Sequence, residues 1–450
     1  RESGRHLHDD REILCVHVLA PSAPAASGPA ARLKCPLDFQ PVNVDRINMA
    51  DLPRLTAAQA AQRLGVKPES LYAYVSRGLL GRVRTAEGST FDPLEVEEFA
   101  LRRSRRSHLR GPADAGLPLM VIDTDVAVVL DDELFYRGRS AAALASGSTL
   151  EEVATSLWGL DADLLPTGDR TDAGRVRGAV RALPASASPI DRLRVAVTVL
   201  AAADPLRDDV SPASFRAAGV RMLQHLPAAL GDAPWSPGDG IATTLWNALA
   251  GRTPGPRDLA ALDAALVLVV DHDLAVSTFA ARVAASARAS AYGVVSAALG
   301  AFDSPLHGTA GRPAADMLRR VMAGDDPGAA IAAAVRAGGR GVPGFGQPLY
   351  TGEDARALAL LPLVARMSGG EDAIAAVDAV AAEVARRVGA QPNVDLALAA
   401  LAVAGDMPGD STAAVFAIGR AVGWIAHGLA EYDERPLRLR PRGRYVGPMP

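Results

Sequence analysis

Apolar residues recur at helical spacing along most of this chain, in runs that Gly and Pro turns separate. The runs 190–202 and 277–299 predict helices, and the shorter apolar run 264–270 predicts a buried helix. Because 264–270 is far shorter than the ~20 residues of a membrane helix, it indicates a protein core. The chain is 49% hydrophobic but only 4% aromatic, so its core must consist mainly of Ala, Leu and Val, which suits closely packed helices. The pattern therefore predicts a mostly α fold.

Length, charge and cysteine usage narrow the class of protein. At 450 residues the chain is long enough for two or three domains, and its net charge of −4 argues against a nucleic acid or a membrane as partner of the whole molecule. Both cysteines, Cys15 and Cys35, precede Met49, so the remaining residues hold no disulfide, cysteine nucleophile or thiolate metal site. This usage predicts a cytoplasmic protein. Residues 1–48 lack sustained periodicity and begin without methionine, which predicts a disordered leader or a wrongly assigned start.

Residues 49–113 predict a small unit of two short helices joined by a glycine turn. Thr56 caps a helix over 57–64, and Pro68 opens a second helix over 69–77. The pair resembles the helix-turn-helix of the MerR and excisionase type. The unit carries 11 Arg and Lys against 7 Asp and Glu, so it is mildly basic.

The helix-turn-helix resemblance implies a DNA partner for residues 49–113, and the alternative is a protein-interaction module. A further short helix is expected over 91–99. The segment 85–92, where a basic wing would lie, has no arginine, which favours the alternative. The candidate DNA-contacting residues are Lys67, Ser70, Tyr72, Tyr74 and Arg77 on the second helix, with Arg82 and Arg84 as phosphate contacts.

Four short motifs concentrate the polar chemistry of the second half of the chain. They read DHD at 271–273, PLHG at 305–308, VPGFGQPLYTGEDAR at 342–356 and PNVD at 392–395. Their order and spacing resemble those of citrate synthases, and the match is specific because the long third motif is flanked by the other three. One residue departs, because Gln347 stands where that family has a histidine.

The resemblance implies a fold and an assembly. A large helical domain would comprise residues 114–306 and 395–450, and a smaller CoA-binding domain would comprise residues 307–394. The family acts as a homodimer with a shared active site, on an acyl-CoA and a 2-keto dicarboxylate. The CoA thioester is then a substrate, and neither a metal nor another cofactor nor a membrane is implied.

The resemblance also implies a role for each motif. Asp395 matches the base that takes the proton from the acyl-CoA methyl group, and His307 matches the histidine that stabilises the enol. His272 matches a histidine that contacts the keto acid. The arginines at dicarboxylate-binding positions are Arg356, Arg420 and Arg440, the last contributed by the partner subunit. The residues that match the CoA-binding loop are Val342, Pro343, Gly344, Phe345 and Gly346.

Gln347 belongs to the candidate catalytic residues, with His307 and Asp395, and it decides whether the chain is interpreted as an active enzyme or as a relative with another function. A glutamine can still donate an N–H to a ketone oxygen, but it cannot transfer a proton, a loss that typically lowers rates by about 10²–10⁴. We interpret the sequence as a citrate synthase-like acyltransferase, with a rate limited by Gln347, that condenses acetyl-CoA or propionyl-CoA with oxaloacetate or a related 2-keto acid. The alternatives are a catalytically impaired sensor or transcriptional regulator that binds DNA, and an interaction subunit that forms heterodimers with an active synthase.

Overall fold

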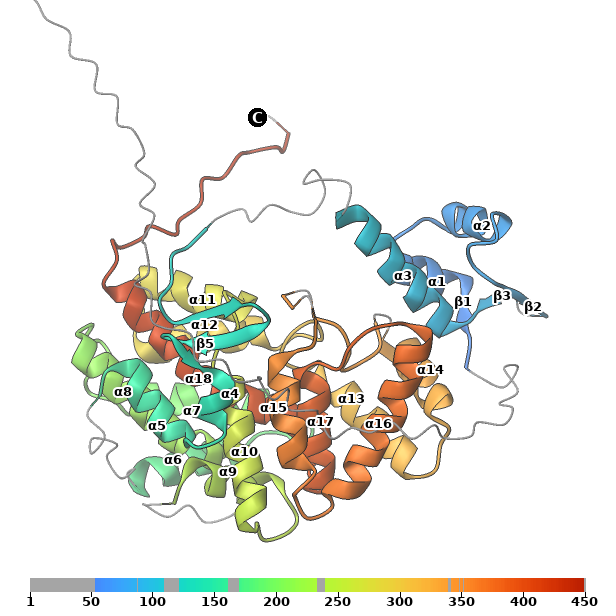
Figure 1. Cartoon of the computed structure of the whole chain (residues 1–450). Helices are drawn as coiled ribbons and strands as arrows, with labels where there is room; N and C mark the ends of the chain where they lie inside the picture. Colours follow the sequence, from blue (N-terminus) through green and yellow to red (C-terminus); the bar gives the residue numbers. More distant parts are fainter. Residues whose placement is uncertain are drawn as a thin grey trace, which may run out of the picture. The chain divides into compact units, whose positions relative to one another are not determined.

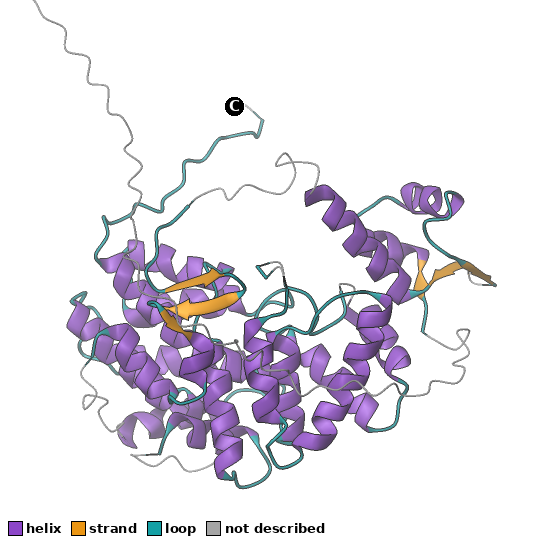
Figure 2. Ribbon diagram, viewed as in Figure 1, coloured by secondary structure: helices purple, strands orange, loops and turns teal. Residues whose placement is uncertain are grey.

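The protein is mostly helical, as the sequence predicts (Figure 1, Figure 2). The computed structural model describes residues 53–86, 88–108, 121–160, 170–232, 239–338, 341–347, 349–350 and 352–448. The leader predicted for residues 1–48 lies outside the described residues. Within the described part of the chain, strands form two small antiparallel sheets of three strands each.

The first described elements form a small helical unit with a three-stranded sheet. They are β1 (Leu55–Thr56), α1 (Ala57–Leu64), α2 (Pro68–Ser76), β2 (Val83–Thr85), β3 (Gly88–Phe91) and α3 (Pro93–His108), with the strands in the order β1-β3-β2. Thr56 caps α1, because its hydroxyl accepts the Gln59 N–H at 3.2 Å and the Gln59 side chain accepts the Thr56 N–H at 2.9 Å. Gly65 then adopts a left-handed conformation, with a φ of 62°, that turns the chain toward α2.

The helix predicted over 91–99 begins two residues later and runs further, as α3. Asp92 sets this start, because its Oδ1 accepts the Leu94 N–H at 2.9 Å, whereas Phe91 belongs to strand β3. A small apolar core, which includes the fully buried Leu71 and Phe91, holds the unit together. The two short helices lie where the sequence predicts them, while their assignment to the MerR type of module stays a prediction.

The main domain opens with a small sheet and continues as packed helices. Strands β4 (Ala127–Leu130), β5 (Glu133–Tyr136) and β6 (Arg139–Ser140) pair antiparallel in sequence order. The helices are α4 (Ala141–Ala145), α5 (Leu150–Trp158), α6 (Arg170–Arg181), α7 (Pro189–Ala202), α8 (Pro212–His225), η2 (Pro227–Ala229, a 3-10 turn), α9 (Ile241–Leu249), α10 (Pro256–Leu268), α11 (Val276–Ser286), α12 (Ala291–Phe302), α13 (Gly311–Met322), α14 (Pro327–Gly338), α15 (Ala355–Val364), α16 (Gly370–Arg387), α17 (Val394–Ala404) and α18 (Ser411–Tyr432).

Helix α18 is the central helix of this domain and packs against α8, α10, α11 and α12 (Figure 1). Among the described residues it is the one helix long and apolar enough to cross a membrane, but 94% of its apolar window is buried inside the protein, as in a core helix. Two glycines let it approach the end of α10. A Cβ on Gly423 would lie 2.0 Å from the Val270 carbonyl oxygen, and one on Gly419 would lie 2.4 Å from that of Leu266.

Two sequence predictions in this domain have different outcomes. The apolar run 264–270 is confirmed as buried, and most of it belongs to α10. The run 277–299, which reads as one continuous helix, is instead divided into α11 and α12. The chain turns between them at Arg288, whose φ is 60°, and Ser290 caps α12 by accepting the Gly293 N–H at 3.3 Å. This local capping interaction overrides the helical periodicity.

Strand β5 positions the end of α10 through one buried side chain. The Tyr136 hydroxyl lies 3.0 Å from the carbonyl oxygen of Val267 and 3.3 Å from that of Asp271. Burial raises the pKa of the Tyr136 hydroxyl well above its usual range, so this group stays a neutral donor. The small sheet thereby fixes the turn that carries the first of the four motifs.

Candidate active site

Residues from all four motifs meet around a cavity of about 280 Å³. The cavity lies where α15, α17 and α18 face the loops that follow α10 and α12. The sequence-predicted residues that line it are His272, His307, Gln347, Arg356, Asp395 and Arg420. The motifs, which are spread over the second half of the chain, therefore converge on one site.

His272 follows the end of α10 and is buried. Its Nε2 lies 3.0 Å from the Tyr350 hydroxyl, which fixes the ring against the loop that bears Gln347. Burial, together with the nearby charges of Arg356 and Arg420, lowers the pKa of His272 far below its usual range. A neutral imidazole near two guanidinium groups can orient a ligand by hydrogen bonds without adding a third positive charge.

His307 lies in the turn after α12 and is held by a buried serine. Its Nε2 is 2.7 Å from the Ser277 hydroxyl oxygen, which also accepts the indole N–H of Trp424 at 3.2 Å. While it accepts from Trp424, the serine can donate its own O–H to Nε2, and in that arrangement the imidazole proton resides on Nδ1. Burial and the charge of Arg420 lower the pKa of His307 to about 4, so the ring is a neutral N–H donor at neutral pH.

Sequence reasoning missed Ser277 and Trp424, which together hold the ring of His307 in place. Both side chains are fully buried, on α11 and α18, and neither belongs to a motif. A lone hydroxyl on a buried helical face must find a hydrogen-bond partner, and this is the signal by which the sequence could have identified Ser277. Packing explains the glycine that follows the histidine, because a Cβ on Gly308 would lie 2.1 Å from the Phe302 ring.

Two buried arginines face the cavity with unequal pairing. Arg356 makes a bidentate ion pair with Asp354, with its Nε and Nη2 at 2.9 and 2.8 Å from the carboxylate oxygens. Arg420 donates its Nε–H to the Val269 carbonyl at 2.7 Å, but its buried Nη1 has no hydrogen-bond partner among the described residues. Burial lowers the pKa of Arg420, as expected of a cation that lacks a close counter-ion. An anionic ligand would supply that counter-ion.

Asp395 occupies the first turn of α17 and is the candidate base. Asn393 caps that helix, and its Oδ1 accepts the Asp395 N–H at 2.9 Å. The Oδ1 of Asp395 is buried and has no partner in the described structure. Burial raises the pKa of Asp395 to about 6, although the charge of Arg356 opposes the shift. Such a carboxylate is more basic than an exposed one and is still ionised at neutral pH.

Backbone hydrogen bonds join the third motif to the fourth. The Gly346 N–H donates to the Gln391 carbonyl at 2.8 Å, and the Asn393 N–H donates to the Gly344 carbonyl at 2.9 Å. Gly344 and Gly346 both have a φ of 82°, and a Cβ on Gly344 would lie 2.8 Å from the Leu396 side chain. Glycine is therefore required where this loop docks against the start of α17.

Gln347 lines the cavity at the end of this loop. Its Oε1 accepts the Leu349 N–H at 3.3 Å, which leaves the side-chain NH₂ group as the part that can reach a ligand. The residues assigned to CoA binding, 342–346, do not line the cavity, and Gly346 is the exposed member of that run. Their role in CoA binding stays a prediction.

The remaining predicted residues lie outside the cavity. Arg440 is exposed, in the segment that follows α18. That it binds the dicarboxylate in the active site of a partner subunit stays a prediction. Tyr74 packs on Phe99 at 4.9 Å between ring centres, so it contributes to the core of the small unit. The other candidate DNA contacts are the half-buried Ser70 and the exposed Lys67, Tyr72, Arg77, Arg82 and Arg84.

A buried hydrogen bond supports the first motif from behind. His427 Nε2 lies 2.8 Å from Asp271 Oδ2, and the Thr278 hydroxyl donates to Asp271 Oδ1 at 3.4 Å. Burial alone would raise the pKa of Asp271, but His427 holds it below its usual range. The carboxylate therefore stays ionised and anchors the turn that presents His272. Neither Asp271 nor His427 lines the cavity, so both act as positioning residues.

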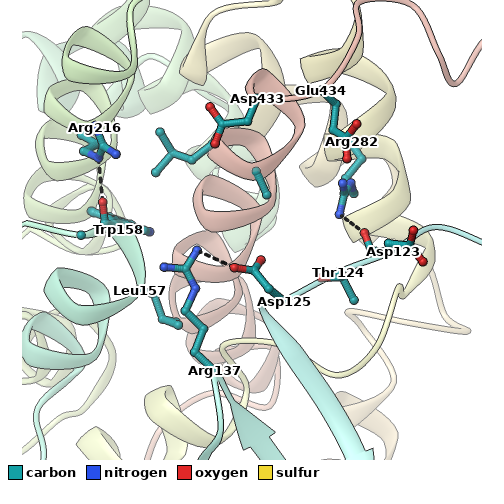
Figure 3. Close-up of a pocket in the computed structure, with 13 residues that line it drawn as sticks. Asp123, Thr124, Asp125, Arg137, Leu157, Trp158, Arg216, Arg282, Asp433 and Glu434 are labelled. Carbon is teal, nitrogen blue, oxygen red and sulfur yellow. Dashed lines mark hydrogen bonds and ion pairs between the residues drawn. The ribbon is translucent and has the colours of Figure 1, made fainter. Parts of the chain in front are cut away.

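A larger cavity, of about 580 Å³, lies beside the C-terminal end of α18 and contains none of the predicted site residues (Figure 3). Its arginines already have partners: Arg137 pairs with Asp125 at 3.5 Å, Arg216 with the Trp158 carbonyl at 2.6 Å, and Arg282 with Glu431 at 2.8 Å. None of the unpartnered buried atoms found among the described residues belongs to it. The smaller cavity is therefore the candidate active site.

Comparison with known proteins points to the same family as the motifs. A family model described as citrate synthase, C-terminal domain, matches residues 118–442. Citrate synthase 2 of Bacillus subtilis is 29% identical over 367 residues, which cover 75% of this chain and 96% of that protein. The 2-methylcitrate synthase of Mycobacterium tuberculosis is 30% identical over 358 residues, which cover 74% of this chain and 90% of that protein.

A solved structure shares the fold of the main domain. The citrate synthase of the archaeon Thermoplasma acidophilum, in a ternary complex with carboxymethyl coenzyme A and oxaloacetate, matches with a TM-score of 0.61 and 24% sequence identity. The match covers 74% of this chain and 95% of that one. The small unit before residue 118 lies outside the family match.

The raised pKa of Asp395 predicts how the stability of the protein depends on pH. The carboxyl titrates near 3.8 in the unfolded chain and at about 6 in the folded one, so between these values the folded state holds a proton that the unfolded state has lost. The stability that protonated Asp395 contributes is therefore fully present below about pH 4 and is lost as the pH rises through about 6.

We expect Asp395→Asn to raise the free energy of unfolding by on the order of 2–3 kcal/mol at pH 8 and to change it little at pH 4. Urea denaturation of both proteins at the two pH values measures this difference. Asp208→Asn is the matched control, because that side chain is 90% exposed. An equal effect of Asp395→Asn at both pH values would contradict a buried carboxyl with a raised pKa.

Proposed function

The chain belongs to the citrate synthase family, and from that premise we propose that it condenses an acyl-CoA with a 2-keto dicarboxylate and releases CoA. Oxaloacetate is the candidate acceptor. The relatives include a citrate synthase and a 2-methylcitrate synthase at nearly equal identity, so acetyl-CoA and propionyl-CoA are both candidate donors. The proposal concerns the main domain.

A buried donor and a buried acceptor without partners, both in one cavity, carry the proposal. They are the Nη1 group of Arg420 and the Oδ1 atom of Asp395. An unpaired buried polar group costs roughly 1–3 kcal/mol, and more when it is charged, so a ligand that pairs with both would relieve a substantial penalty. The carboxylate of a keto acid fits Arg420, and the C–H group beside a thioester carbonyl fits Asp395.

In the proposed reaction Asp395 removes a proton from the carbon next to the thioester carbonyl. The Nδ1–H of His307 donates to the enolate oxygen that forms. The carbon then attacks the ketone carbon of the keto acid, and the ketone oxygen takes up the negative charge. Arg420 and the amide N–H of Gln347 stabilise that charge. Water finally hydrolyses the thioester, which releases CoA and the tricarboxylate.

Gln347 limits one step of this sequence. Its NH₂ group can hydrogen-bond the ketone oxygen, but it cannot supply the proton that the new alkoxide needs, so that proton must come from solvent. Proton removal by Asp395 and enolate stabilisation by His307 do not depend on it. We therefore propose a slow synthase rather than an inactive one.

We further propose a homodimer in which each site takes Arg440 from the partner subunit. An exposed apolar row on α11 supports this assembly: Val276, Phe279 and Val283 are 58%, 37% and 40% exposed. Their spacing puts them on one face of the helix. The row begins soon after His272, so a second copy that covered it would lie close to the cavity.

A second function, DNA binding, is proposed for the small N-terminal unit. Exposed cations before and after α2 support it, because Lys67, Arg77, Arg82 and Arg84 all face solvent. The Arg82 guanidinium lies 5.9 Å from the centre of the exposed Tyr72 ring. Clustered cations of this kind suit contact with a phosphate backbone.

Thiol release from acetyl-CoA and propionyl-CoA, with and without oxaloacetate, tests the reaction. We expect release that depends on the keto acid, that falls as the pH drops through about 6, and that Asp395→Asn abolishes, because an amide cannot accept the proton. Gln347→His should raise the rate by about 10²-fold or more, since it restores a proton donor. Asp208→Asn should leave the rate unchanged. Release that Asp395→Asn does not alter would refute the mechanism.

Sedimentation tests the assembly. Phe279→Glu should convert a dimer into a monomer, because it places an unpaired charge in the apolar row. Arg440→Ala should leave the dimer intact but raise the KM for oxaloacetate, while Arg312→Ala, on the exposed face of α13, should change neither. A parent protein that sediments as a stable monomer at micromolar concentration argues against a shared site.

Duplex binding at several salt concentrations tests the N-terminal unit of the full chain. We expect an affinity that falls steeply with salt, and the double substitution Lys67→Ala and Arg77→Ala should reduce the slope by about 2. Arg312→Ala again serves as the control. Equal binding to a non-nucleic polyanion, or no binding at low salt, would indicate a protein-interaction module instead.

A further inference from the structure

We propose that a separate cavity in the main domain binds the phosphate group of a small anion. This cavity has a volume of about 250 Å³ and lies between α6, α7 and the η2 turn. Three arginines, Arg177, Arg181 and Arg192, line it against one carboxylate, Asp232. Such an excess of guanidinium groups on a concave surface has the chemistry of an anion site. None of its lining residues belongs to the candidate active site.

Arg177 gives the most direct sign of a missing ligand. Its Nε atom is buried and has no hydrogen-bond partner in the described part of the chain. A buried donor on a charged group is unfavourable without an acceptor, so it calls for an explanation such as a ligand or an ion. Arg177 and Arg181 also lie four residues apart on α6, so two like charges share one face of that helix.

Ordinary structural reasons account for only one of the three arginines. Arg181 lies in the last turn of α6, where the helix dipole favours a cation, and its Nε is 3.1 Å from Asp232 Oδ1. Both members of that pair are more than half exposed, so the bond neutralises little charge. Arg192 lies near the start of α7, where the dipole disfavours a cation. An anion bound in the cavity would explain both Arg177 and Arg192.

The size and donor arrangement of the cavity narrow the ligand class. Its volume of about 250 Å³ leaves room for a phosphate group and a small organic substituent. Guanidinium groups from two helices, α6 and α7, line the cavity and can donate from different directions. Donors arranged in this way suit the several acceptor oxygens of a tetrahedral oxyanion better than the two oxygens of a planar carboxylate. Val180 and Leu183 form an apolar part of the wall that could contact a small organic group. The ligand is therefore a phosphate, free or carried by a small metabolite.

Calorimetric titration of the full chain with inorganic phosphate and with AMP tests the site. Arg177→Gln and Arg192→Gln should each weaken binding by roughly 10- to 100-fold, because each removes a charge-assisted hydrogen bond. Arg177→Lys keeps the charge but lacks Nε, so an intermediate loss is expected. Arg207→Gln, an exposed arginine outside the cavity, should leave the affinity unchanged. Tighter binding of AMP would identify a phosphorylated metabolite, and equal binding would identify free phosphate.

Three results would overturn the proposal. Displacement of the anion by CoA would show that the anion binds in the proposed CoA site. Unchanged phosphate affinity in both Arg177→Gln and Arg192→Gln would show that phosphate binds outside this cavity. Succinate that binds as tightly as phosphate would refute the ligand class. Thermal unfolding of each variant without ligand shows that it is folded, so that a loss of affinity can be assigned to the arginine itself.

Discussion

The close crossing of α18 over the end of α10 is the constraint on which the candidate site depends. It requires glycine at position 423, because a Cβ on Gly423 would collide with the backbone that follows α10. Because the two helices cross so closely, the Arg420 Nε–H donates to the Val269 carbonyl oxygen at 2.7 Å, and His427 Nε2 lies 2.8 Å from Asp271 Oδ2. One helix thus supplies a guanidinium that lines the cavity and the support for the turn that presents a histidine. A change that widened the crossing would displace both together.

Burial sets the protonation of the site, and buried positive charge modifies it. Arg356 has a full carboxylate partner in Asp354, whereas Arg420 has a carbonyl and an unpartnered Nη1. Their charges help to keep His272 neutral and oppose the rise in the pKa of Asp395. A dianion bound between these groups would cancel that opposition and raise the pKa of Asp395 further. Binding of a keto acid would therefore strengthen the base at the stage where a proton must be removed.

Local order along the chain explains which parts of the structure could be predicted. Each of the motifs that carry His307 and Asp395 is contiguous in sequence, so their resemblance to the motifs of a known family was enough to predict that both line one cavity. The hydroxyl of Ser277 and the indole of Trp424 meet across two helices that are distant in sequence, and no spacing rule predicts that contact. The break at Arg288 was missed for a related reason, because apolar periodicity continues on both sides of a turn that capping determines.

Gln347 is the departure from the family pattern that bears on proton transfer, and the rate it costs in the proposed mechanism depends on which step limits turnover. If removal of the proton by Asp395 is slowest, the missing proton donor matters little. If protonation of the alkoxide is slowest, the full loss of about 10²–10⁴ applies. In the proposed mechanism the positive charge of Arg420 reduces that loss, because a nearby guanidinium stabilises an alkoxide electrostatically without giving up a proton. In the proposed mechanism the substitution therefore removes a proton donor, leaves stabilisation of the alkoxide charge to Arg420, and does not affect the candidate base Asp395.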